Sequence, residues 1–213
     1  GEAPAVARSS VRQQVCFGLL CLVLCFITGG EHAAATWLAP LGIEFGGFGI
    51  GSAAMMTSLF WSTICICRLV WCAASACVTS SWPTLLVDVS LMSVGSLMLL
   101  AFARAPSSGG ALWASALITG LGASSGLPCV MALPAEVGVP MTPFAIAMLN
   151  AAGSFGETVF PFICGIAFDR RLVFGIGLFL LSMNLLSVLS TSLAWALAAR
   201  RPKQGAPGVK RIN

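Results

Sequence analysis

Six long apolar stretches are the feature that most restricts how this chain can fold. They cover about residues 15–38, 52–78, 84–103, 111–133, 144–168 and 172–198. The hydrocarbon core of a bilayer is about 30 Å thick, and a helix needs about 20 apolar residues to cross it. The stretches reach this length, are rich in Ala, Leu and Gly, and show no alternation at period two, which favours helices over barrel strands. The sequence therefore predicts an all-α membrane protein with six transmembrane helices.

Composition excludes the other broad classes. Charged residues make up only 8% of the chain, against roughly 25% in soluble proteins, and the mean hydropathy is +0.96. Disordered chains, coiled coils and soluble disulfide scaffolds are therefore ruled out, and the lipid bilayer is the expected environment. The net charge of +4 is too small to mark a nucleic-acid surface. The nine cysteines lie mostly inside apolar runs and indicate buried thiols, so we expect no metal and no cofactor.

Basic residues outside the spans predict the orientation. With six spans, both termini lie on one side, and that side carries seven basic residues against three on the other. The seven are Arg8, Arg12, Arg200, Arg201, Lys203, Lys210 and Arg211, and the three are Arg104, Arg170 and Arg171. Basic residues accumulate on the cytoplasmic side. We therefore expect a cytoplasmic segment at 1–14, a six-helix bundle at 15–198 and a basic cytoplasmic tail at 199–213, in the plasma membrane rather than an organelle.

The start of the chain allows a second interpretation. Arg8 and Arg12 before an apolar run are also typical of a secretory signal peptide, with Ala33-Ala34-Ala35 as the cleavage site. The run is longer than the roughly 7–15 apolar residues of a signal peptide, so a transmembrane helix is favoured. Because the chain begins with Gly1 rather than Met, we expect it to be a fragment of a longer protein.

Two carboxylates fall within the spans. Glu31 lies in the outer half of the first span, and Glu157 lies close to the middle of the fifth. An ionisable group facing lipid costs at least about 2.5–3.5 kcal/mol on the insertion scale. These side chains are therefore expected to face protein or a water-filled cavity. For Glu157 a functional role is favoured, because helix packing needs no carboxylate.

The fifth stretch carries a polar stripe. Asn150, Ser154 and Glu157 are spaced i, i+4 and i+7 and so share one face of a helix. Two glycines and Pro161 interrupt the same stretch. A polar helix broken by Gly and Pro is typical of transporter sites, whereas a hydrogen-bonded seam between packed helices is the alternative for Asn150 and Ser154.

The second stretch carries another stripe at helical spacing, which includes Trp61 and Arg68. Arg68 can snorkel to the interface, but Asp88 lies near the inner end of the next helix, so we predict a structural Arg68–Asp88 ion pair. Trp61 lies away from the span ends, where tryptophans usually anchor. It is therefore either a stacking platform for a ring-shaped substrate or a core residue.

The remaining chemical signals are weak. His32, the only histidine, is either a proton relay or a polar residue satisfied near the outer surface. The segment Gly122-Ala123-Ser124-Ser125-Gly126 matches the pattern of a serine-hydrolase elbow, but the histidine lies upstream and the segment lies within an apolar helix. We interpret these glycines as a helix-packing face and expect no enzymatic activity, with an intramembrane hydrolase as a remote alternative.

Several segments together resemble one transporter family. They are Ile27-Thr28-Gly29-Gly30-Glu31, Thr36-Trp37-Leu38, Thr57-Ser58-Leu59-Phe60-Trp61, Arg68-Leu69 and Gly153-Ser154-Phe155-Gly156-Glu157, with Pro161 and Gly165 following. This order is similar to helices seven to twelve of the major facilitator superfamily, in the branch of fucose permease and the sodium-dependent glucose transporter-like proteins. Cys67 and Ala33-Ala34-Ala35 depart from the pattern of that branch.

The resemblance implies half of a twelve-helix transporter, built as two inverted three-helix repeats and working by alternating access. It implies that Glu31, Trp61, Asn150 and Glu157 line a central cavity. Glu31 or Glu157 would carry a coupling proton or help to hold a sodium ion. The implied cargo is a small polar solute such as a sugar, and the implied partner is an N-terminal six-helix half or a second copy of the chain.

A different class of function fits the same residues. A half-transporter exposes a polar face that lipid does not tolerate, so the chain could instead be a non-transporting scaffold or assembly subunit whose partner covers that face. Gradient-driven solute uptake that depends on Glu157 would distinguish the two hypotheses.

Overall fold

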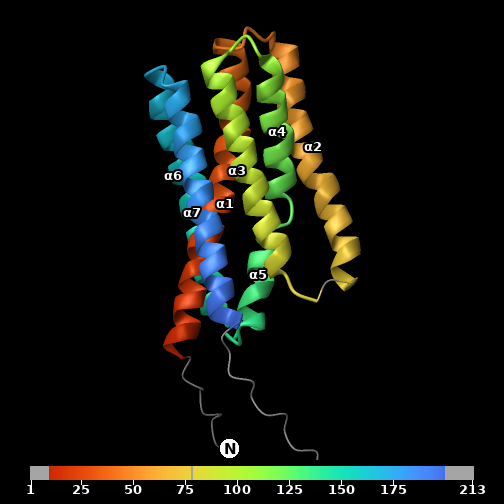
Figure 1. Cartoon of the computed structure of the whole chain (residues 1–213), viewed down its shortest axis with the longest axis vertical. Helices are drawn as coiled ribbons and strands as arrows, with labels where there is room; N and C mark the ends of the chain where they lie inside the picture. The colour runs from red at the N-terminus through yellow and green to blue at the C-terminus, as the bar shows by residue number, and fades with distance from the viewer. Residues whose placement is uncertain (1–9, 78, 200–213) are drawn as a thin grey trace, which may run out of the picture.

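The computed structural model describes residues 10–77 and 79–199 as a bundle of long helices that run along one axis (Figure 1). In chain order they are α1 (Val11–Glu44), α2 (Ile50–Ala74), the short 3-10 helix η1 (Ser75–Cys77), α3 (Trp82–Arg104), α4 (Gly109–Ala123), α5 (Gly126–Glu136), α6 (Pro143–Asp169) and α7 (Val173–Ala199). Because α4 and α5 follow one path, the described residues form six segments long and apolar enough to cross a membrane. The predicted helical class and the number of spans are confirmed.

Local sequence explains where two of the helices begin. Ser10 accepts a hydrogen bond from the backbone of Gln13 at 3.3 Å, and the Gln13 side chain accepts one from the backbone of Ser10 at 2.7 Å. This capping box satisfies amide groups at the helix start. Thr142 caps α6 in a similar way, accepting from Ala145 N at 3.2 Å, and Pro143 occupies the first helical position, where its missing N–H costs nothing.

The helices extend beyond some of the predicted stretches. The first stretch, 15–38, lies inside the longer α1, because the capping box starts the helix earlier than its apolar part. The second stretch, 52–78, ends later than α2, which stops at Ala74 and is followed by η1, while residue 78 lies outside the described residues. Most of the predicted terminal segments, 1–9 and 200–213, also lie outside them.

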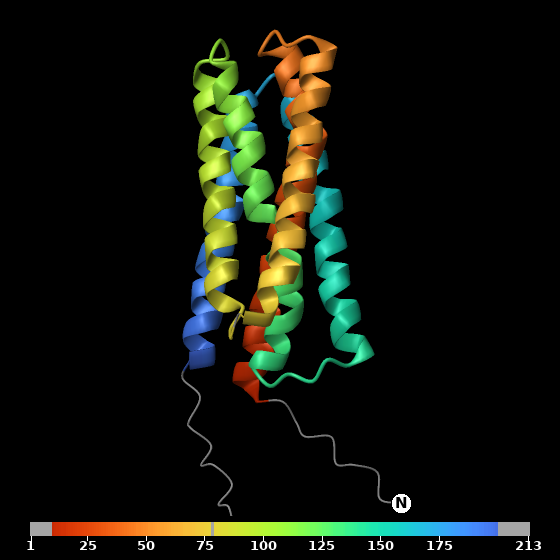
Figure 2. The ribbon, with the colours of Figure 1, turned by 90° about the vertical axis from the view of Figure 1, so that its right-hand side faces the viewer.

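Helix α1 holds the bundle together. It packs most extensively against α6, and also against α7, α2, α4 and α5. Helix α3 packs against α4 and α7. Figure 1 shows α2 at the opposite side of the bundle from α6 and α7, and Figure 2 shows α2 in front of α1 with α6 at the edge. Helices α2 and α6 are thus flanking elements, joined through α1.

Glycines set the closest approaches between helices. A Cβ atom on Gly156 of α6 would overlap the carbonyl oxygen of Cys25 on α1, and one on Gly122 of α4 would lie 2.6 Å from the carbonyl oxygen of Asp88 on α3. Small residues at such crossings let two backbones pack directly. The predicted packing role of Gly122 is therefore confirmed.

The fourth span, not the fifth, is discontinuous. The sequence pointed to a break in the fifth, but α6 continues through Pro161 to Asp169. The fourth span is interrupted between α4 and α5 by Ser124 and Ser125. Ser124 N bonds to Leu121 O at 3.3 Å, three residues back rather than the four of an α-helix, so the segment that we expected to be one helix is two.

Candidate functional site

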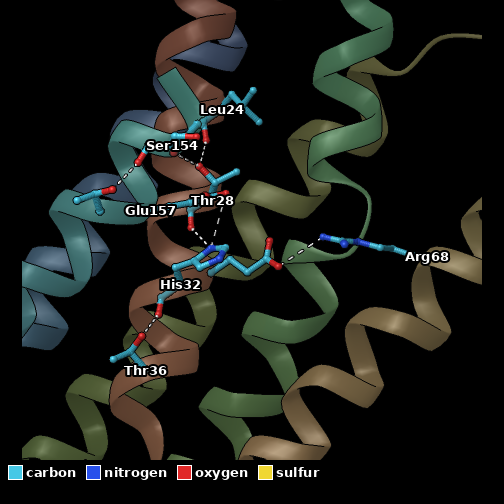
Figure 3. A network of polar contacts seen from close by, with 10 residues as sticks. Leu24, Thr28, His32, Thr36, Arg68, Ser154 and Glu157 are labelled. Carbon is cyan, nitrogen blue, oxygen red and sulfur yellow. Dashed lines mark hydrogen bonds and ion pairs between the residues drawn. The ribbon is translucent and has the colours of Figure 1, made fainter. Parts of the chain in front are cut away.

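A cluster of ionisable side chains lies around the central part of α1, with α6 on one side and α2 and the α4–α5 break on the other (Figure 3). Helix α1 contributes Glu31 and His32, α2 contributes Arg68, and α6 contributes Glu157. Glu31, His32 and Glu157 lie near the midpoints of their helices, far from either end of the apolar segments. The structure therefore brings together the two carboxylates that the sequence singled out, far from the ends of the helices that carry them.

Arg68 ties Glu31 to the break. Its Nη2 atom lies 3.4 Å from Glu31 Oε1, and its Nε donates to the backbone oxygen of Ser124 at 2.9 Å. The Glu31 side chain is only 6% exposed, whereas that of Arg68 is 39% exposed. A carboxylate removed from water needs such a partner, so the guanidinium compensates the charge of Glu31 from the more open side.

Backbone chemistry makes the Ser124 oxygen available to Arg68. In a continuous helix this oxygen would accept the N–H of the residue four positions later, which is Pro128. Proline has no N–H, so that hydrogen bond cannot form. Arg68 supplies the missing donor from another helix, and the break becomes part of the site.

The predicted Arg68–Asp88 pair is corrected by the structure. Arg68 pairs with Glu31, while Asp88 Oδ2 accepts a hydrogen bond of 2.6 Å from the hydroxyl of Ser125. Both charged residues thus bind the α4–α5 break, but at consecutive residues. Asp88 is buried on α3 and contacts Ser125, whereas Arg68 contacts the Ser124 oxygen from α2. The two side chains thus approach the break from different helices and do not pair with each other.

His32 and Glu157 form a second, more open pair. His32 Nδ1 lies 3.9 Å from Glu157 Oε1, and the two side chains are 41% and 39% exposed. The distance is too long for a hydrogen bond. The contact joins α1 to α6 on the opposite side of Glu31 from Arg68, because successive helical positions point about 100° apart.

The proton position on His32 follows from its nearest neighbour. Nδ1 lies 3.1 Å from the backbone oxygen of Thr28, and a carbonyl oxygen can only accept a hydrogen bond. We therefore assign the proton to Nδ1. In the neutral ring Nε2 then carries the lone pair and can accept a hydrogen bond.

The other predicted site residues lie on the same side of the bundle. The ring of Trp61 on α2 is 6.5 Å from that of His32, edge to face, and 5.4 Å from that of Phe60. Trp61 is 39% exposed, so it is not a core residue. Asn150 and Ser154 are exposed on α6, in the two turns before Glu157.

These groups belong to a larger surface that we call the polar face. It comprises exposed or half-exposed polar and tryptophan side chains in the central parts of α1, α2 and α6, namely His32, Thr36, Ser58, Trp61, Ser62, Arg68, Asn150, Ser154, Glu157 and Thr158. Several of its hydroxyls bond to the carbonyl four residues back in their own helix, as Thr36 does with His32 at 2.8 Å and Thr158 with Ser154 at 2.9 Å. Among its ionisable groups, His32 also bonds to the carbonyl oxygen four residues back, that of Thr28, whereas Arg68 and Glu157 contact side chains of other helices.

Two contributors were missed by the sequence analysis. Ser124 contributes a backbone oxygen, and the signal for it was Pro128, four residues later. Thr28 helps to set the position of α1 along α6, because its hydroxyl lies 3.0 Å from Gly153 O on α6 and 2.9 Å from Leu24 O of its own helix. A threonine facing a glycine-interrupted helix is the only sequence signal for that contact.

Within residues 10–77 and 79–199 no group of three or more His, Cys, Asp or Glu side chains is placed to hold a metal ion.

These observations define the chain as an all-α, multi-pass integral membrane protein with a polar cluster at mid-depth. No family model, curated protein or solved structure matches it.

Proposed function

We propose that this chain is one six-helix half of a secondary transporter of the major facilitator type, which moves a small polar solute, such as a sugar, by alternating access. The observation that carries the proposal is the half-exposed Glu157–His32 pair at the middle of two membrane-spanning helices. A bundle held together only by helix packing has no need of open ionisable groups at that position.

The energetic argument concerns what covers the polar face. A carboxylate facing acyl chains costs at least about 2.5–3.5 kcal/mol by insertion measurements, and the Glu157 side chain is 39% exposed within this bundle. A water-filled passage shared with a second bundle removes that cost. The proposed partner is an N-terminal six-helix half or a second copy of this chain, seated on α1, α2 and α6.

The contacts between helices support two inverted three-helix repeats. If α1, α2 and α3 correspond to α4–α5, α6 and α7, exchanging the two sets turns the α1–α6 contact into α4–α2, and the α3–α4 contact into α7–α1. All four contacts occur in the bundle, whereas the α1–α2 contact has no equally extensive counterpart between α6 and the α4–α5 span. Transporters of this class place their sites between such repeats.

The cluster suggests a division of roles. The charge of Glu31 is compensated by Arg68, whereas the ion-pair contact of Glu157 within the described residues is the longer one to His32, at 3.9 Å. Glu157 is therefore the better candidate to carry a coupling proton or to help hold a sodium ion. Trp61 and Asn150, exposed on the helices that flank α1, are proposed to contact the solute.

The orientation is also proposed. Helix α1 begins and α7 ends at the same end of the bundle (Figure 1). The basic residues that adjoin this end favour the cytoplasm, and the plasma membrane is the expected location.

Transport is tested with the complete protein in lipid vesicles. Uptake of radiolabelled D-glucose and L-fucose is measured under an inward proton or sodium gradient, for the wild type, Glu157→Gln and Glu44→Gln. Glu44 is an exposed carboxylate at the end of α1 and serves as the matched control. We expect Glu157→Gln to lose the gradient-driven uptake and Glu44→Gln to keep it. Unaltered uptake in Glu157→Gln would remove Glu157 from the mechanism.

Water access distinguishes the transporter from a scaffold. In a background where the exposed Cys65, Cys72 and Cys77 are serines, Ser154→Cys is treated with a membrane-impermeant maleimide in sealed vesicles. We expect labelling, because the proposed passage admits water to the polar face. Complete protection, together with a monodisperse monomer in mild detergent, would favour the scaffold.

A further inference from the structure

A small cavity lies behind the polar cluster, on the side of α1 that faces α3, α4 and α7. The cavity has a volume of about 10 Å³, which is about the smallest volume that holds one water molecule. It is lined by Gly30, Ala33, Ala34, Trp37, Leu38, Leu41, Ser96, Leu99, Ser115, Thr119, Ile176, Leu180 and Asn184. None of these side chains is ionisable, so the cavity suits a neutral ligand.

Asn184 directs its carbonyl group to this space. Its Nδ2 donates to Met92 O at 3.2 Å and to Ser96 Oγ at 2.9 Å. Because Met92 O can only accept, the nitrogen of the carboxamide must be on that side. The Oδ1 atom then points to the other side, 3.4 Å from where a Cβ on Gly30 would lie, and it accepts no hydrogen bond from the described residues. Asn184 itself is only 3% exposed.

Thr119 on α4 presents the complementary group. Its hydroxyl is buried with the residue at 6% exposure and makes no hydrogen bond to another described residue. Next to it in the lining, Ser115 donates to Gly95 O at 2.8 Å and Ser96 donates to Met92 O at 3.1 Å. Both of these hydroxyls retain acceptor capacity. The cavity thus combines one unused donor, one unused carbonyl acceptor and two further acceptor oxygens.

We propose that this cavity is a binding site for a single structural water molecule, which accepts from the Thr119 hydroxyl and donates to Asn184 Oδ1. Its second proton goes to the oxygen of Ser115 or Ser96. A buried water typically makes about three hydrogen bonds, and here they link α4 to α7 across α1 and α3. The absence of a side chain on Gly30 leaves the room. The site does not depend on the proposed transport function.

The direct test is a structure of the full chain in lipid at a resolution that shows ordered water. We expect one density peak within hydrogen-bonding distance, about 2.7–3.2 Å, of both Asn184 Oδ1 and Thr119 Oγ1. Well-defined side chains around a cavity without such a peak would overturn the proposal. In Gly30→Ala the added methyl group would lie 3.0 Å from Met92 Cε and 3.4 Å from Asn184 Oδ1. Because it narrows the cavity at this wall, the peak is expected to weaken or disappear while the Met92 side chain shifts.

A stability comparison tests the hydrogen bonds. Thr119→Val keeps the shape of the side chain and removes the hydroxyl, so it leaves the water short of a donor. The control is Ser93→Ala, because Ser93 is buried on α3 but bonds only to Val89 O of its own helix. We expect Thr119→Val to lower the unfolding temperature by about 2–4 °C more than the control. An equal or smaller loss would contradict the proposal.

Discussion

Two pairs of helices in this bundle solve the problem of polar groups in a membrane in opposite ways. In α3 and the α4–α5 span, 50% and 61% of the most apolar window is buried within the bundle, against 28% in α2 and 22% in α6. We call them the core pair and the flanking pair. The buried polar groups of the core pair are mostly hydroxyls, whereas the flanking pair carries exposed Trp61 and the partly exposed Arg68 and Glu157. The exception in the core pair is Asp88, which is buried and accepts a hydrogen bond from Ser125. Apart from it, the buried polar groups are neutral, whereas the charged groups of the flanking pair lie where a partner or water can reach them.

Backbone contact separates the two pairs as well. The core pair fits through glycines, since a Cβ on Gly122 or on Gly95 would collide with the neighbouring helix of the pair. On α2, by contrast, Gly51 faces open space. The core pair is therefore expected to be intolerant of added atoms, and α2 to tolerate one at Gly51, whereas α6 is as closely packed at Gly156, where an added Cβ would overlap the carbonyl oxygen of Cys25 on α1. Four substitutions test this comparison, and thermal unfolding in mild detergent measures the first three.

The largest effect is expected from Gly122→Ala in the core pair. The obstructing atoms are the backbone oxygen of Asp88 at 2.6 Å and the backbone nitrogen of Met92 at 2.7 Å, which cannot rotate away. We expect a loss of about 3 kcal/mol, at the upper end of overpacking costs. Gly51→Ala on α2 is the control from the flanking pair, because nothing lies within 4 Å of its added Cβ, and it is expected to be neutral or slightly stabilising. Equal losses in the two variants would break the comparison.

The next effect is expected from Arg68→Met, which leaves the buried carboxylate of Glu31 and the Ser124 oxygen without their donor. Hydrogen bonds to charged groups contribute about 1.5–3 kcal/mol, and the partial exposure of Arg68 places the loss near about 2 kcal/mol. The double variant Arg68→Met/Glu31→Gln is expected to recover part of it, because no uncompensated charge remains. A double variant less stable than Arg68→Met would show that the two residues are not paired.

A smaller effect is expected from Ser125→Ala, which removes the 2.6 Å hydrogen bond to Asp88. Because the Asp88 carboxyl group is buried, the loss is expected to be about 1.5 kcal/mol. Ser90→Ala is the matched control on the same helix as Asp88, since its exposed hydroxyl bonds only to Leu86 O. If both variants lose the same stability, the contact between α3 and the break contributes nothing measurable.

The smallest effect on stability is expected from Glu157→Gln in the flanking pair. The carboxylate is partly exposed and 3.9 Å from His32, so its removal should change the free energy of unfolding by less than about 0.5 kcal/mol. Chemical denaturation in detergent measures this change. A large loss would mean that Glu157 serves the fold, and the proposed transport role would lose its main support.

Much of the fold could be predicted from the sequence because the thickness of a membrane sets the length of the helices that cross it. Apolar runs of the length of 144–168 have few ways to avoid spanning a bilayer, and the helices coincide with them. The ends were less predictable, since the start of α1 depends on Ser10 and Gln13 rather than on apolar content.

The site was only partly predictable, because spacing along one helix does not fix how helices are rotated against each other. Arg68 was predicted to pair with Asp88. Its actual partner follows only from the arrangement of the helices, in which Glu31 faces α2 and Asp88 is bonded to Ser125 of the break. Likewise, nothing in the sequence of α6 alone indicates that Glu157 meets His32. The position of each residue along its helix could be predicted from the sequence, whereas the direction in which its side chain points around the helix axis could not.

Pro128 shows how one residue can act on a helix that it does not touch. Because Pro128 lacks an amide hydrogen, the Ser124 oxygen remains available as a hydrogen-bond acceptor for the guanidinium of Arg68. Pro128→Ala would restore a donor in the same helix, which would compete for that oxygen. Arg68 would then keep its contact with Glu31 but lose the one with the break. The contact between the second and fourth spans can therefore be weakened or strengthened without altering any charge in the cluster.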